Sequence, residues 1–136
     1  RTDLLVNNFV ETAVKKGKLE IFEPNFRRNF IHIHDIVDAF LFSIKNFAKL
    51  KNNIFNLGLS SANISKINLA RKIKKVIPKT KVIINRKGND PDKRDYFVSN
   101  KKIEKAGFKA KVSLDEGIRE LNGIFQNCDI KFINNY

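Results

Sequence analysis

Apolar residues recur along the chain at two periods, and the alternation of these periods predicts its secondary structure. Spacings of three and four residues, typical of helices, occur in residues 3–16, 35–46, 65–77, 99–107 and 113–126. Short apolar runs that are typical of strands lie at residues 19–22, 30–33, 53–57 and 81–85. Because strands and helices alternate, the expected fold class is α/β.

Capping residues and helix breakers mark where these elements should begin and end. Asp35, Ser65 and Ser113 are the predicted N-caps of three helices, because their side-chain oxygens can accept hydrogen bonds from the first helical amides. Gly17 and Pro78 are predicted to end the helices that precede them. The helix boundaries are therefore predicted by a feature that is independent of the apolar period.

The bulk composition predicts one folded domain spanning residues 1–136. The chain has 136 residues, 42% of them hydrophobic, and 12 phenylalanines, which is enough to bury a core. It has no apolar run near the roughly 20 residues of a membrane-spanning helix and no secretory signal pattern. Its single cysteine, Cys128, cannot form an internal disulfide, so we expect a cytoplasmic protein without a membrane partner. It also has no methionine and begins at Arg1, so we expect it to be part of a longer polypeptide.

The net charge of +13 and the pI near 10.0 raise the alternative of a basic nucleic-acid-binding module. Such a module needs basic side chains on one face, with aromatic rings free to stack on bases. Here the lysines are scattered over every segment, and Phe9, Phe40 and Phe55 stand at core-spaced positions. A solvated basic surface explains the charge better, so we do not expect nucleic acid as a partner.

Two arginine-bearing stretches contain the candidate chemistry, residues 27–35 (RRNFIHIHD) and 90–96 (DPDKRDY). Each places arginine beside a turn-rich loop and next to a run that is predicted to be regular structure. Guanidinium groups bind phosphate oxygens through two parallel hydrogen bonds, whereas a lysine ammonium acts as a point charge. The two stretches therefore indicate a site for an anionic small molecule such as a diphosphate.

Four motifs follow one another through most of the chain. Residues 28–35 read R-N-F-I-H-I-H-D, and residues 56–58 read N-L-G before the predicted helix cap Ser65. Residues 94–108 read R-D-Y-x-V-S-x-x-K-I-x-x-x-G-F, and residues 113–118 read S-L-x-x-G-I. In this order and at these spacings they resemble the extended short-chain dehydrogenases/reductases, in the branch of the NAD-dependent nucleotide-sugar epimerases and dehydratases.

This resemblance implies a fold and an incomplete enzyme. The chain would be the substrate-binding C-terminal lobe of a Rossmann-like enzyme, together with the last strand and helix pieces of the cofactor domain. The parent enzyme, such as a UDP-glucose 4-epimerase-like protein, would bind NAD(P) mainly through an N-terminal half that is not in this sequence. The Gly-rich turn of that half is missing here, and Tyr96 is followed four residues later by Asn100 instead of the lysine of a Tyr-x-x-x-Lys pair. We therefore expect no catalytic residue and no bound cofactor in this chain.

The resemblance also implies which residues bind a nucleotide-diphosphate sugar. Arg28 would contact the diphosphate, and Arg94 or else Arg86 would be the second arginine. Residues of the strand at 19–22 would run along the base. Asn7 would substitute for an asparagine that binds the diphosphate in the family and is replaced here by Asp3. The substrate-binding candidates are Arg28, Arg94, Arg86, Phe22, Glu20 and Asn7.

Two further interpretations complete the predictions. His32 and His34 are spaced to share one face of a strand, with Asp35 adjacent, but no third ligand is evident, so we do not expect zinc. His34 and Asp35 are expected to serve the start of the following helix. The remaining alternative is an inactive fragment that self-associates, because a partial sheet exposes apolar edges.

Overall fold

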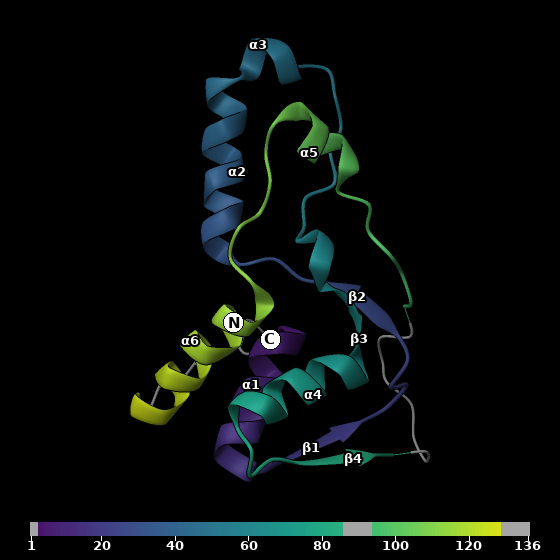
Figure 1. Cartoon of the computed structure of the whole chain (residues 1–136), viewed down its shortest axis with the longest axis vertical. Coiled ribbons are helices and arrows are strands. Elements are labelled where there is room, and N and C mark those ends of the chain that lie inside the picture. The colour runs from purple at the N-terminus through teal and green to yellow at the C-terminus, as the bar shows by residue number, and fades with distance from the viewer. Residues whose placement is uncertain (1–2, 86–93, 129–136) are drawn as a thin grey trace. The chain divides into compact units, whose positions relative to one another are not determined.

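The computed structural model describes residues 3–85 and 94–128, whose contacts divide the chain into two compact units (Figure 1). Unit 1 comprises Arg1–Phe26, Ser65–Arg94 and Asp115–Tyr136. Unit 2 comprises Arg27–Ile64 and Asp95–Leu114. We describe each unit by itself.

Unit 1 is built on two parallel strands. Strand β1 (Lys18–Ile21) pairs with β4 (Lys81–Ile84) in a register that places Lys18 opposite Lys81 and Ile21 opposite Ile84. Helix α4 (Lys66–Val76) contacts both strands, and α1 (Leu5–Lys16) contacts β1 and α4. Most of α6 (Leu114–Asn127) also belongs to this unit. The fully buried apolar side chains of unit 1 are Val10, Leu19, Ile21, Leu69, Ala70, Ile73 and Ile118.

The helix ends in unit 1 follow the sequence signals closely. Gly17 adopts the left-handed conformation (φ 62°) that ends α1, and its N–H donates to the Ala13 carbonyl. The Ser65 side chain accepts a hydrogen bond from the Asn68 amide and so caps α4, as predicted. Strands β1 and β4 pair in parallel, and helix α4 lies between them in the sequence. This arrangement confirms the predicted α/β class.

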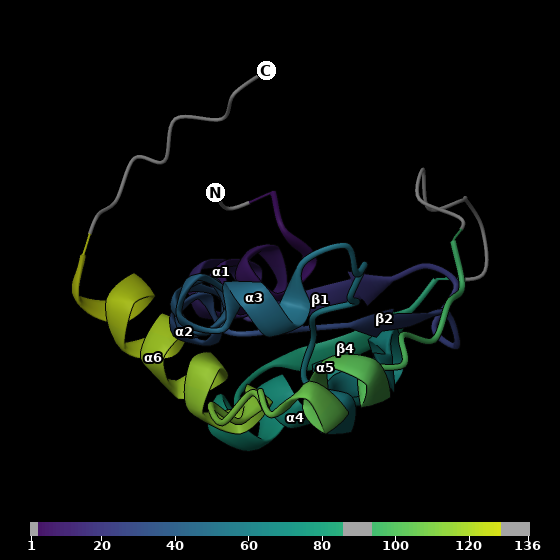
Figure 2. The same ribbon diagram turned by 90° about the horizontal axis from the view of Figure 1, so that it is seen from above.

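Unit 2 contains two short paired strands, three α-helices and one 3-10 helix. Strand β2 (Arg27–Asn29) pairs with β3 (Asn63–Ser65), which follows the 3-10 helix η1 (Ser60–Ala62). Helix α2 (Ile33–Lys45) is followed by the short α3 (Phe47–Leu50), which extends away from the α2 axis (Figure 2). Helix α5 (Lys101–Ala106) ends at Gly107. The core of unit 2 consists of Ala39, Ile103 and Phe108, with Phe42, Phe55 and Leu57 packed against them.

Three sequence predictions for unit 2 are wrong in detail. The strand predicted at residues 30–33 lies instead at Arg27–Asn29, because the pairing with β3 decides its position. Residues 53–57 are irregular where a buried strand was predicted, and Ile54 is 89% exposed. The N-cap of α2 is His32, whose Nδ1 accepts from the His34 amide at 3.3 Å, and not Asp35. Short-range apolar patterns do not specify which segment finds a pairing partner.

The apolar face of α2 is exposed in unit 2, contrary to the core position that its spacing predicted. Phe40 is 66% exposed and Ile44 is 71% exposed, whereas Asp35 and Ala39 on the other side of the helix are buried. The exposed apolar residues of α2 and α3 are Ile33, Val37, Phe40, Leu41, Ile44 and Phe47. Of the aromatic residues predicted to be core, Phe9 is buried and Phe55 is partly buried.

None of the helices in the described part of the chain has the length and apolarity needed to cross a membrane.

Candidate functional site

Strand β2 presents two consecutive arginines to different surroundings. Arg27 is exposed and Arg28 is 6% exposed, because successive side chains of a strand point to opposite faces. The same strand carries Asn29, whose side-chain amide donates to the Leu59 carbonyl at 2.9 Å. The start of the first arginine-bearing stretch, residues 27–29, therefore forms one strand of a two-stranded sheet in unit 2.

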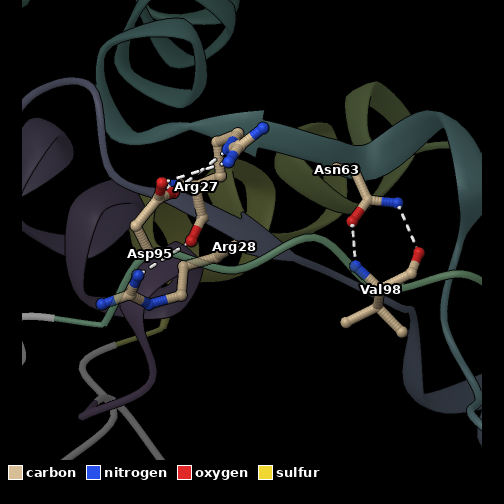
Figure 3. Close-up of polar contacts among 5 residues, drawn as sticks. All are labelled: Arg27, Arg28, Asn63, Asp95 and Val98. Carbon is tan, nitrogen blue, oxygen red and sulfur yellow. Dashed lines mark hydrogen bonds and ion pairs between the residues drawn. The ribbon is translucent and has the colours of Figure 1, made fainter.

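The second stretch binds to this strand through Asp95. The Asp95 carboxylate accepts three hydrogen bonds from Arg27, from the backbone amide at 2.7 Å and from Nε and Nη2 at 3.1 Å each (Figure 3). Two parallel bonds from one guanidinium to one carboxylate fix the direction of both side chains. The contact joins residues that are 68 positions apart in the sequence.

A second pair of hydrogen bonds holds the same segment three residues later. The Asn63 side chain accepts from the Val98 amide at 2.9 Å and donates to the Val98 carbonyl at 3.0 Å (Figure 3). An amide side chain that pairs with both backbone groups of one residue substitutes for a strand partner. Residues 95–98, which we call the strap, are therefore bound at both ends to the β2–β3 region.

Arg28 contacts both its own strand and the strap. Its Nη1 donates to the Arg27 carbonyl at 2.8 Å (Figure 3). Its guanidinium carbon lies 5.2 Å from the centre of the Tyr96 ring, within the range of a cation–π contact. The arginine implied by the resemblance and the tyrosine of the second stretch are thus in direct contact.

The Arg27–Asp95 pair changes the acidity of both groups. The pKa of Asp95 is lowered, first by the side-chain hydrogen bonds from Arg27, then by the Arg27 amide and by the charges of Arg27 and Arg28. The pKa of Arg27 is raised by the same pair. A carboxyl group with a lowered folded-state pKa stabilises the fold above its unfolded-state pKa of about 3.9, and that contribution is lost as the pH falls through the folded-state value.

We expect Arg27→Ala to raise the pKa of Asp95 toward its ordinary value, without restoring it fully, because the backbone amide at position 27 and the charge of Arg28 remain. NMR titration of the side-chain carboxyl carbons measures this directly. Arg119→Ala, an exposed arginine of α6, is the control and should leave the pKa of Asp95 unchanged. An Asp95 pKa that is the same with and without the Arg27 side chain would show that the ion pair does not form in solution.

A buried lysine supports the turn that precedes β2 in the sequence. Lys66 is 2% exposed, and its Nζ donates to the Phe22 carbonyl at 2.8 Å and lies 5.5 Å from the centre of the Phe26 ring. The amides of Lys66 and Ile67 donate to the carbonyls of Phe26 and Pro24. The first turn of α4 is therefore bonded to the turn formed by residues 22–26, all within unit 1.

The remaining site candidates are distributed over both units and the part of the chain outside the described residues. Phe22 is partly buried directly after β1, and Glu20 is exposed on β1, where it accepts from Lys18 at 2.9 Å. Asn7 is partly buried on α1. Arg94 is exposed and belongs to unit 1, whereas Arg86 lies outside the described residues. The convergence of Arg28 with either of these arginines stays a prediction.

The histidines and Asp35 have structural contacts in unit 2. The rings of His32 and His34 meet edge to face with centroids 4.8 Å apart. The Asp35 carboxylate accepts from the amides of Lys111 at 2.9 Å and Val112 at 3.0 Å, so it fixes a distant segment and does not cap its own helix. Within residues 3–85 and 94–128, no group of three or more His, Cys, Asp or Glu side chains could hold a metal ion.

The sequence predictions gave no role to Asp95, Tyr96 and Asn63, which shape the site in unit 2, or to Lys66 in unit 1. Asp95 and Tyr96 lie inside a recognised motif, so the motif is the signal that could have found them. Asn63 and Lys66 flank the recognised cap Ser65, but no local pattern indicates that their side chains bond backbone groups 35 and 44 residues away.

Comparison with curated proteins gives a relative that makes a nucleotide sugar. No family model matches the chain. It is 26% identical over 121 residues to the GDP-L-colitose synthase of Yersinia pseudotuberculosis, a match that covers 87% of this chain and 39% of that protein. The chain therefore spans well under half the length of this relative.

Two solved structures share the fold. RMD from Pseudomonas aeruginosa, complexed with NADPH, superimposes with a TM-score of 0.73 at 12% identity, over 93% of this chain and 43% of that one. UDP-glucose 4-epimerase from Thermotoga maritima, with UDP-glucose, superimposes with a TM-score of 0.70 at 22% identity, over 90% and 39%. The resemblance found in the sequence is thereby confirmed as a likeness: the chain is similar in sequence to a GDP-L-colitose synthase and shares its fold with part of solved epimerase, dehydratase and reductase structures.

Proposed function

We propose that this chain forms the nucleotide-diphosphate-binding part of an NAD(P)-dependent epimerase, dehydratase or reductase that acts on a nucleotide sugar. The observation that carries the proposal is the position of Arg28, a buried guanidinium on β2 that stacks against Tyr96 of the second arginine-bearing stretch. A buried, oriented arginine is suited to bidentate recognition of phosphate oxygens. Relatives that act on nucleotide sugars, including one structure with UDP-glucose, support this choice of ligand.

The proposed role in the reaction is to hold the substrate at a distance from the chemistry. Binding energy from the nucleotide and diphosphate would place the sugar for reaction and lower the barrier of the chemical step. In this proposal Arg28 and one of Arg94 or Arg86 contact the diphosphate, and Phe22, Glu20 and Asn7 contribute to the surroundings of the nucleotide.

The glycines of the described residues do not offer a cradle for the pyrophosphate of a dinucleotide. Gly17 and Gly107 end helices, and Gly117 and Gly123 lie inside α6. Gly58 is buried, with the Asn29 side chain placed directly where its Cβ would be. We therefore propose that NAD(P) is held by protein beyond this chain, and we assign no hydride-transfer step to its residues.

The exposed apolar face of α2 supports a contact with protein outside this chain. Side chains such as Phe40 and Ile44 are more than half exposed on successive turns of one helix, and clustered exposed apolar side chains mark interaction surfaces. In the proposed enzyme this face is covered by the rest of the polypeptide. Self-association of an inactive fragment is the alternative, and sedimentation at several concentrations separates the two, because only self-association depends on concentration.

We expect Arg28→Ala to weaken the binding of a UDP-, dTDP- or GDP-sugar about tenfold, because a hydrogen-bonded charge contact contributes about 1.5 kcal/mol. Isothermal titration calorimetry on the complete gene product measures the affinity. Arg28→Lys keeps the charge but loses the bidentate geometry, so it should retain part of the affinity that Arg28→Ala loses. Arg119→Ala is the matched control, because it removes an exposed arginine of unit 1.

Unchanged affinity of a folded Arg28→Ala protein would contradict the proposed contact of Arg28 with the diphosphate. Binding to single-stranded nucleic acid that weakens with salt, without competition by nucleotide sugars, would favour the basic nucleic-acid-binding module instead. Circular dichroism of each variant separates a lost contact from a lost fold.

A further inference from the structure

The strap is anchored at its two end residues and carries two aromatic residues between them. Asp95 is fixed by Arg27, and Val98 is fixed by Asn63. Tyr96 and Phe97 lie between them and are 38% and 64% exposed. Because both ends are bonded to the β2–β3 region, the backbone that carries the Tyr96 ring is held in place.

The ring of Tyr96 lies against the guanidinium of Arg28 at 5.2 Å. An aromatic face attracts a cation without neutralising its charge, whereas a carboxylate in the same place would compete with a phosphate. The neighbouring carboxylate, Asp95, is bonded instead by Arg27 through its backbone amide and its guanidinium. Arg27 thus bonds the carboxylate of the strap, and Arg28 lies against its Tyr96 ring.

We propose that Tyr96 is a positioning residue, whose ring orients the Arg28 guanidinium for the diphosphate of a nucleotide ligand. The proposal rests on the proposed function and adds the residue that determines how Arg28 is presented. Arginine has many side-chain rotamers, and immobilising a flexible side chain costs affinity when it occurs only upon binding. A ring that holds the guanidinium beforehand, together with the bond from Nη1 to the Arg27 carbonyl at 2.8 Å, removes part of that cost.

The test compares Tyr96→Leu with Tyr96→Phe in the complete gene product, using UDP, dTDP and GDP and the matching nucleosides as probes. Tyr96→Leu is expected to weaken binding of the nucleoside diphosphate that the protein prefers about three- to tenfold, with little change for its nucleoside, since cation–π contacts have this strength. Tyr96→Phe retains the ring and should retain the affinity. Phe97→Leu, the adjacent aromatic residue of the strap, is the control for general effects on this segment.

A double-mutant cycle with Arg28→Met separates the failure of this inference from failure of the proposed function. If Tyr96 acts through Arg28, Tyr96→Leu has no further effect once Arg28 is replaced. A wild-type protein that binds no nucleoside diphosphate overturns the proposed function, and the inference with it. A wild-type protein that binds, and that Arg28→Met weakens but Tyr96→Leu does not, overturns the inference alone. Equal effects of Tyr96→Leu with and without Arg28 overturn it too, since the ring would then act by another route.

Discussion

Replacing Asp35 by alanine is expected to lower the free energy of unfolding of unit 2 by about 2–4 kcal/mol. The carboxylate is 2% exposed and accepts two backbone hydrogen bonds, from Lys111 and Val112. Hydrogen bonds to charged groups contribute about 1.5–3 kcal/mol each, and part of this loss is offset by water, because Lys111 is exposed and Val112 is only partly buried. Asp35→Asn keeps the shape and one good acceptor, so its cost should fall between those of the wild type and the alanine variant.

Amide hydrogen exchange reads this effect at the atoms concerned. The amides of Lys111 and Val112 should exchange faster in Asp35→Ala, together with the amides of α2, because they open with the unit. Asp38→Ala is the matched control, since Asp38 is an exposed aspartate on the same helix. Protection of Lys111 and Val112 that is equal in the Asp35→Ala and Asp38→Ala proteins would contradict the assigned role of Asp35.

Replacing Gly58 by alanine is expected to lower the stability of unit 2 by about 2–3 kcal/mol. An added Cβ would fall directly on Oδ1 of Asn29, 2.8 Å from Cγ of that residue and 3.1 Å from Oδ1 of Asn100. Asn29 would have to give up its bond to the Leu59 carbonyl, which contributes about 1 kcal/mol, and crowding of a packed site adds about 1–2 kcal/mol. Because Asn29 follows Arg28 on β2, the strain would act on the strand that carries the site.

Urea unfolding followed by circular dichroism measures this loss of stability. The test of the mechanism is Gly58→Ala in an Asn29→Ala background, where the obstructing amide is gone and the cost should be clearly smaller. Gly123→Ala is the control, because a Cβ at this position inside α6 meets nothing within 4 Å and should stabilise the helix by about 0.5–1 kcal/mol. An equal cost of Gly58→Ala in both backgrounds would rule out the steric explanation.

Much of unit 1 could be predicted from the sequence because its signals are local. Gly17 ends α1, Ser65 caps α4, and the parallel pair β1 and β4 lies within one residue of the apolar runs that predicted it. Each of these signals acts through hydrogen bonds and side-chain periods that span only a few residues. The resemblance to a known family rested on the same kind of local information, since its motifs are short and follow one another in order.

The sequence indicated in part which segments of unit 2 meet. The sequence indicated that residues 27–35 and 90–96 bear the chemistry, and the structure places Arg27 and Arg28 against Asp95 and Tyr96 in unit 2. It did not indicate which arginine would pair with the aspartate and which would be buried. That choice depends on the alternation of side chains along β2, whose position in the sequence was predicted three residues too late.

By itself the sequence determined the α/β class, the helix boundaries of unit 1 and the two stretches that carry arginine, because these depend on neighbours a few residues apart. Only the tertiary structure decided that Asp35 bonds Lys111 and Val112, and that Tyr96 covers Arg28. The residues of these contacts are separated by 68 to 77 positions, and which of them meet depends on strand pairing and burial along the whole chain. No period of two, three or four residues carries that information.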